Sequence, residues 1–72
     1  MASKVGIIAA IEYLYKDETL EIYRTVIYFE DGSTLTIKGY FVLRLGVVTV
    51  RITHTGSGAA VNVTSVERLS LE

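Results

Sequence analysis

The chain of 72 residues contains no cysteine, no tryptophan and no proline, and it has a single histidine, His54. Without cysteine it cannot form a disulfide, a thiolate zinc site or a cysteine nucleophile. Soft and borderline metal ions prefer imidazole and thiolate ligands, and His54 is the only such side chain. We therefore expect no bound metal and no other cofactor.

Long hydrophobic runs are also missing. The run from Val5 to Ile11 ends at Glu12 and has no convincing cleavage site after it, so it is a poor signal sequence. Nothing approaches the roughly 20 apolar residues of a membrane span. We expect a cytoplasmic protein that does not contact a membrane. Residues 1–72 are predicted to form one small β domain, although Leu71 and Glu72 resemble a cloning remnant.

What the chain does have is apolar surface. Half of its residues are hydrophobic and its mean hydropathy is +0.41. A domain this small buries only about 60% of its unfolded surface, and natural domains of this size usually add a disulfide, a metal or a neighbouring subunit. Since the first two are excluded or not expected, we predict a homo-oligomer or a complex with another protein.

Most segments are rich in Val, Ile, Thr, Tyr and Phe, which favour strands. They are separated by polar or glycine-containing breakers, and the segments between the breakers are 5–15, 20–30, 33–38, 40–54 and 59–71. We therefore predict an all-β fold: a single five-stranded, bent antiparallel sheet or small barrel. The first segment also fits an amphipathic helix near residues 7–15, which would make the fold α+β.

Two registers are open at the Asp31-Gly32 turn, which is a strong hairpin signal. A two-residue turn pairs Tyr28 with Leu35, whereas a three-residue turn with Gly32 as the bulge pairs Ile27 with Leu35. In either register an apolar or aromatic set remains on the other face of the second strand. Such a face usually marks an interface.

Two changes of side-chain parity predict irregular strands. A β-bulge at Gly46-Val47 would put the apolar residues of segment 40–54 on one face. A short turn at residues 64–67 would explain the second change. Strand, one-turn helix and strand near the C-terminus is an arrangement similar to SH3-like barrels, which implies a small closed barrel.

These patterns predict a non-catalytic interaction or structural module that assembles through the second apolar face of the first two strands. The predicted interface residues are Tyr23, Ile27, Phe29, Tyr13 and Tyr15. The alternative is a small nucleic-acid-binding β-barrel, because the predicted bulge would gather basic and hydroxyl side chains on one face. That basic stripe would use Lys38, Arg44, Arg51 and Arg68, although a pI of about 5.7 is acidic for such a protein.

No catalytic constellation is visible in the sequence. His54 lies close to Ser57, but the residues around Ser57 do not form a G-x-S-x-G elbow. The acidic pairs Asp17-Glu18 and Glu30-Asp31 lie in predicted turns, where neighbouring side chains diverge. We expect the protein not to be an enzyme.

Overall fold

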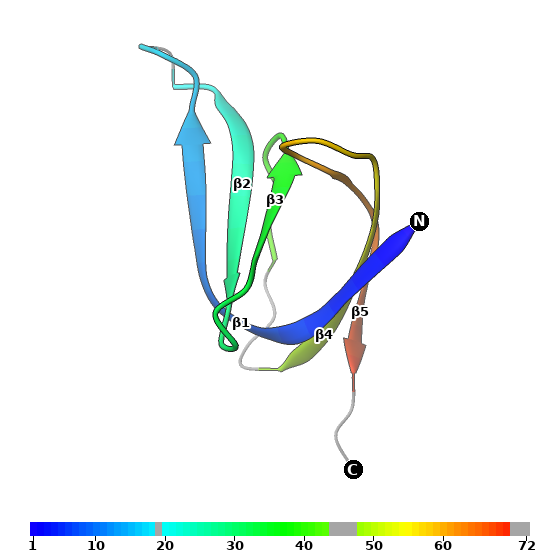
Figure 1. The fold of residues 1–72 in the computed structure, drawn as a ribbon. Helices are drawn as coiled ribbons and strands as arrows, with labels where there is room; N and C mark the ends of the chain where they lie inside the picture. The colour runs from blue at the N-terminus through cyan, green and yellow to red at the C-terminus, as the bar shows by residue number, and fades with distance from the viewer. Residues whose placement is uncertain (19, 44–47, 70–72) are drawn as a thin grey trace.

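A computed structural model describes residues 1–18, 20–43 and 48–69 of the chain (Figure 1). The strands are β1 (Ala2–Tyr15), β2 (Ile22–Phe29), β3 (Thr34–Lys38), β4 (Thr49–Thr55) and β5 (Asn62–Leu69). They form one antiparallel sheet in the order β3-β2-β1-β4-β5. The all-β prediction is confirmed. The described residues contain no helix, so the alternative of a helix near 7–15 is wrong. It follows that this part of the chain has no membrane-spanning helix.

The central strand β1 bends the sheet. Its first half, Ala2 to Ile7, pairs with β4, and its second half, Ile8 to Tyr15, pairs with β2. The register shifts at Ala9, which is an extra residue on β1. Strands commonly pass from one layer to another at such bulges. In Figure 1 the blue strand curves through the base of the molecule, so the two halves of the sheet face each other.

The core lies between these two halves. Ile27, Phe29 and Ile37 come from the β2–β3 half, and Val50 and Ile52 come from β4. All five side chains are buried. Burial of such side chains is the main favourable term in folding, and here it requires both halves of the sheet to be in place.

The β2–β3 hairpin has the three-residue turn. Ile27 pairs with Leu35 and Tyr28 with Thr34, so the second of the two registers is the one formed. Gly32 has a φ of +90°, and its amide donates to the carbonyl of Phe29 at 3.0 Å. A type I turn followed by a left-handed glycine is the common way to build such a loop.

The sheet is bent but not closed into a barrel. Among the described residues, its two edges are bridged where Ile37 of β3 pairs in parallel with Val61, the residue before β5. There the Lys38 amide donates to the Val61 carbonyl at 2.8 Å, and the Val61 amide donates to Thr36 at 3.0 Å. Along β5 itself no described residue of β3 continues this pairing.

The predicted long strand at 40–54 is wrong in its first part, because β4 begins only at Thr49. Gly39 turns the chain with a φ of +83°. The buried hydroxyl of Thr25 then donates to the Gly39 carbonyl at 2.8 Å and accepts from the Phe41 amide at 3.1 Å. A side chain thus satisfies backbone groups that a strand partner would otherwise take. The predicted bulge at Gly46-Val47 lies outside the described residues.

The predicted turn at 64–67 is also wrong, since β5 runs without a break from Asn62 to Leu69. Thr53 pairs with Ser65 but His54 pairs with Val63, so Thr64 is an extra residue in a β-bulge. A bulge changes side-chain parity just as a turn does. The feature on which the resemblance to SH3-like barrels depended is therefore a bulged strand. Leu71 and Glu72 lie outside the described residues.

Candidate functional site

Four of the five tyrosines gather at the end of the sheet that carries the β1–β2 loop. The rings of Tyr13 and Tyr40 are 5.2 Å apart and tilted by 50°. Tyr15 and Tyr23 line one shallow hollow, together with residues of the loop. The Gly39 amide donates to the Tyr23 carbonyl at 2.7 Å, which holds the segment leading to Tyr40 against β2. We call Tyr13, Tyr15, Tyr23 and Tyr40 the aromatic end.

Local irregularities place these side chains. Leu14 pairs with Arg24 but Tyr15 pairs with Ile22, so Tyr23 is an extra residue on β2. The bulge leaves Tyr23 42% exposed, and the Arg24 guanidinium lies 5.2 Å from its ring centre. A cation over an aromatic ring is attracted by the ring's quadrupole. The strand therefore presents the Tyr23 ring at the surface, in contact with the neighbouring guanidinium.

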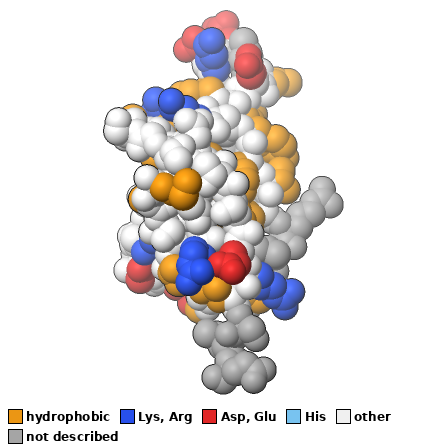
Figure 2. Space-filling model, turned by 90° about the vertical axis from the view of Figure 1, so that its right-hand side faces the viewer, with side chains coloured by type: hydrophobic (Ala, Val, Ile, Leu, Met, Phe, Trp, Pro, Cys, Tyr) orange, Lys and Arg blue, Asp and Glu red, His pale blue; other side chains and the backbone are white. Residues whose placement is uncertain are grey.

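The aromatic end is open to solvent. Tyr15 is 54% exposed and Tyr40 is 62% exposed. The nearby loop residue Leu20 is 91% exposed, and Val42, two residues beyond Tyr40, is 42% exposed. Figure 2 shows hydrophobic side chains, in orange, along the right-hand margin of the upper half of the molecule, the half that contains the β1–β2 loop in Figure 1. Large apolar groups gathered in this way usually mark a contact surface.

The structure divides the interface residues predicted from the sequence. Tyr13, Tyr15 and Tyr23 lie together in the aromatic end. Ile27 is fully buried and Phe29 is 3% exposed, because the three-residue turn directs both into the core. We therefore leave Ile27 and Phe29 out of the candidate surface. The sequence prediction missed Tyr40, whose position depends on the turn at Gly39.

The other face of β1 and β2 is more polar than the sequence suggested. Tyr28 is 38% exposed there, and its hydroxyl donates to the carboxylate of Glu12 at 2.7 Å. This hydrogen bond, with smaller contributions from desolvation and the charge of Glu12, raises the pKa of Tyr28 above its ordinary value of 10.0. The ring lies on the face opposite Ile27, so it is separate from the core. Tyr28 is thus an exposed tyrosine with a defined local partner.

The basic residues proposed for nucleic-acid binding do not form one stripe among the described residues. Arg44 lies outside them. Arg51 donates to Glu67 at 2.7 Å and forms an ion pair with it, and Arg68, as the next residue on β5, points to the opposite face. Lys38 lies on β3, at the far edge of the sheet. The positive charges are therefore dispersed.

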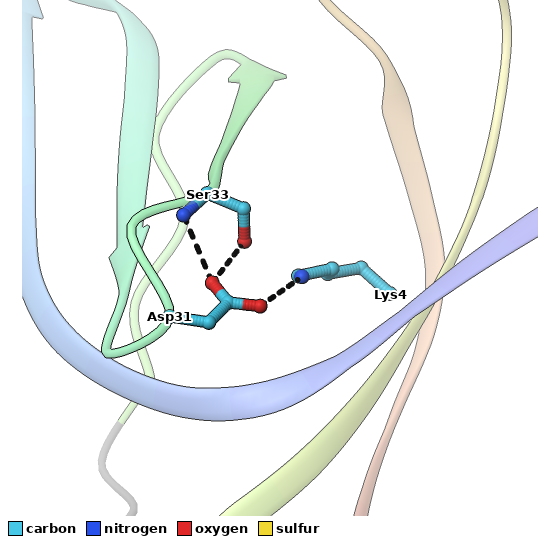
Figure 3. Close-up of polar contacts among 3 residues, drawn as sticks. All are labelled: Lys4, Asp31 and Ser33. Carbon is cyan, nitrogen blue, oxygen red and sulfur yellow. Dashed lines mark hydrogen bonds and ion pairs between the residues drawn. The ribbon is translucent and has the colours of Figure 1, made fainter.

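A polar cluster ties the β2–β3 turn to the first half of β1, as Figure 3 shows. One carboxylate oxygen of Asp31 accepts from the Ser33 amide at 2.9 Å and from the Ser33 hydroxyl at 2.5 Å. The other accepts from the Lys4 ammonium at 2.9 Å, and that ammonium also lies 5.0 Å from the centre of the Phe29 ring. The hydrogen bonds from Ser33 and then from Lys4 hold the pKa of Asp31 well below its ordinary value of 3.8. Such a carboxylate is a weak base, so the cluster fits a structural role.

Groups suited to metal binding or acid–base chemistry are sparse in the described part of the chain. No three His, Cys, Asp or Glu side chains lie close enough together there to hold a metal ion. The Nδ1 atom of His54 is buried and has no hydrogen-bond partner among the described residues, so no carboxylate of that part of the chain orients the ring through this atom. Triad-type catalysis depends on such an orienting group.

Comparison with known proteins returned no matching family model, no matching curated protein and no matching solved structure. The functional conclusion therefore depends on the geometry of the chain itself.

Proposed function

We propose that the protein is a small, non-catalytic interaction module that assembles with copies of itself through the aromatic end. The observation that carries this proposal is the exposure of Tyr15, Tyr23 and Tyr40 together at one end of the sheet. Tyrosine is favoured at interfaces because it offers a large apolar ring and a polar tip with few rotatable bonds.

The amount of exposed surface supports self-association. The chain has an accessible surface of 4933 Å². The scaling for compact monomers gives about 4,400 Å² for a mass of 7.9 kDa, so roughly 500 Å² is in excess. Part of the surface that a compact monomer would bury is therefore available for contact.

The area is also close to what a dimer needs. If a fully exposed large side chain contributes roughly 200 Å², then the aromatic end with its apolar neighbours offers about 580 Å² per copy. This sum takes the exposed fractions of Tyr15, Tyr23, Tyr40, Leu20 and Val42. Two copies would bury about 1,150 Å², near the lower limit of about 1,200 Å² for specific interfaces.

We propose that a second copy of the same chain covers the aromatic end. A C2 contact joins the same surface patch on both partners, so it needs no further molecule. The hollow beside the tyrosines is lined by Lys16 and Asp17 as well, so its rim carries both signs of charge. A contact between two copies therefore does not place surfaces of the same charge opposite each other.

The test is the mass in solution, measured by light scattering over a range of protein concentrations. We expect the unmodified chain to give a multiple of 7.9 kDa. The double variant Tyr15→Ser/Tyr40→Ser should lower the mass, and Tyr28→Ser should not, although it also removes an exposed tyrosine. Far-ultraviolet circular dichroism is the control that each variant is folded. A monomer at every concentration, or a double variant with undiminished mass, would overturn the proposal.

A further inference from the structure

The outer edge of β5 is an open edge of the sheet among the described residues. The strand has eight residues, Asn62 to Leu69; five are exposed and none is buried. Its inner edge pairs with β4, and no described residue pairs with its outer edge along this span. On the opposite side of the sheet, β3 is shorter, and its edge is met by Val61. An open edge presents unpaired N–H and C=O groups that can accept another strand.

The first half of β5 is protected by a bulge. Thr64 is the extra residue of the bulge, and its hydroxyl donates to the Thr53 carbonyl at 3.1 Å. Bulges discourage edge-to-edge pairing because they twist the edge away. From Ser65 to Leu69 the pairing with β4 is regular, and this span contains neither proline nor lysine, which are common protective residues at edges.

We propose that residues 65–67 pair antiparallel with the same residues in the β5 strand of a second copy, about a two-fold axis at Val66. A two-fold axis normal to the sheet keeps every side chain on its own face. Because opposite residues of an antiparallel pair point to the same face, the axis must lie midway between two copies of the same residue. An axis at Glu67 or at Arg68 would place two like charges directly opposite each other, which destabilises a pair of strands. An axis at Val66 instead sets Val66 opposite Val66 and Ser65 opposite Glu67. An axis at Ser65 would bring the bulged Thr64 into the ladder, so among axes at residues 65–68 the charge pattern and the bulge together favour Val66.

This contact goes beyond the proposed function, and a different observation carries it. The aromatic end lies at the β1–β2 loop, whereas β5 forms an edge of the sheet on the far side of β4. A chain with two separate self-complementary contacts joins copies alternately through one and then the other. The product is an extended row of copies rather than a closed pair.

Single cysteines provide the test, because the chain has none of its own. Residues directly opposite in an antiparallel pair have Cα atoms about 4.5–5.5 Å apart, within disulfide range. Under mild oxidation, a mixture of Ser65→Cys and Glu67→Cys chains should form a covalent heterodimer. Each variant alone should remain mostly uncrosslinked, because its identical residues lie about 8 Å apart in this register. Equal crosslinking of all three samples, or none in the mixture, would overturn the register.

Charge variants test the same contact without oxidation. In the Tyr15→Ser/Tyr40→Ser background, we expect a dimer held by β5 alone. Adding Ser65→Glu sets carboxylates opposite Glu67 in two symmetric pairs and should raise the dissociation constant roughly tenfold, whereas Ser65→Lys should not. A monomeric background variant, or equal effects of the two substitutions, would overturn the β5 contact and leave the aromatic end standing.

Discussion

Gly6 offers the sharpest test of the bend in β1. A Cβ atom at this position would lie 2.9 Å from Cδ1 of Phe29 and 3.5 Å from Cγ. Carbon atoms pack best at about 3.5–4.0 Å, so Gly6→Ala would require a shift of roughly 0.6 Å. Phe29 is 3% exposed and belongs to the core cluster, so its ring has little room to move.

The expected loss follows from two opposing effects. Overpacking of a core costs about 1–3 kcal/mol. Replacing glycine where the backbone tolerates alanine stabilises by about 0.4–1 kcal/mol, because it restricts the unfolded chain. Gly6 is not among the glycines with positive φ, so that gain applies. Gly6→Ala should therefore lower the free energy of unfolding by about 1–2 kcal/mol, and the Tm by about 5–15 °C.

Thermal unfolding followed by circular dichroism, at matched protein concentration, measures this loss. Phe29→Leu removes the ring that the added Cβ atom would meet. In that background, Gly6→Ala should therefore lower the free energy of unfolding by at least about 1 kcal/mol less than in the unmodified chain. A neutral or stabilising Gly6→Ala would refute the close approach of β1 to Phe29. Additive losses in the double variant would refute the assignment of the cost to this contact.

Two further predictions concern polar contacts. Thr25→Val removes the hydroxyl that bonds Gly39 and Phe41, so it should lower the free energy of unfolding by about 1–3 kcal/mol and speed hydrogen exchange at the Phe41 amide. Thr25→Ser should keep that amide protected. Equal protection in both variants would contradict the role of the hydroxyl. The pKa of Asp31 is lowered in the folded state, so its charged form stabilises the fold above about pH 4 and the effect fades as the pH falls further. The stability difference between the unmodified chain and Asp31→Asn should therefore shrink from about pH 6 to about pH 2 in urea titrations, and a constant difference would count against the Lys4–Asp31 contact.

The sequence predicted the elements of this fold better than their irregularities. Strand-forming composition and the Asp31-Gly32 turn identified the all-β class and the β2–β3 hairpin. The register at that turn stayed open, because both turn lengths use the same two residues. Ile27 and Phe29 were consequently assigned to an interface, although they form part of the core. A shift of register changes the face of a strand without changing the sequence.

The bulges had weaker signals. Ala9 and Tyr23 are extra residues only with respect to the strand beside them, so neither position is unusual in its own segment. At Thr64 the change of parity was visible in the sequence, but a turn and a bulge produce the same change. Tyr40 joined the aromatic end through the hydroxyl of Thr25, 15 residues earlier in the chain, which no local pattern reveals.

The bend in β1 also determines how the molecule comes apart. The two hairpins, β2–β3 and β4–β5, share one bridge at Ile37 and Val61 and are otherwise joined through β1. Each half of the sheet has an apolar face that packs against the other half. We therefore expect the two halves to open together, so that unfolding is a single cooperative event.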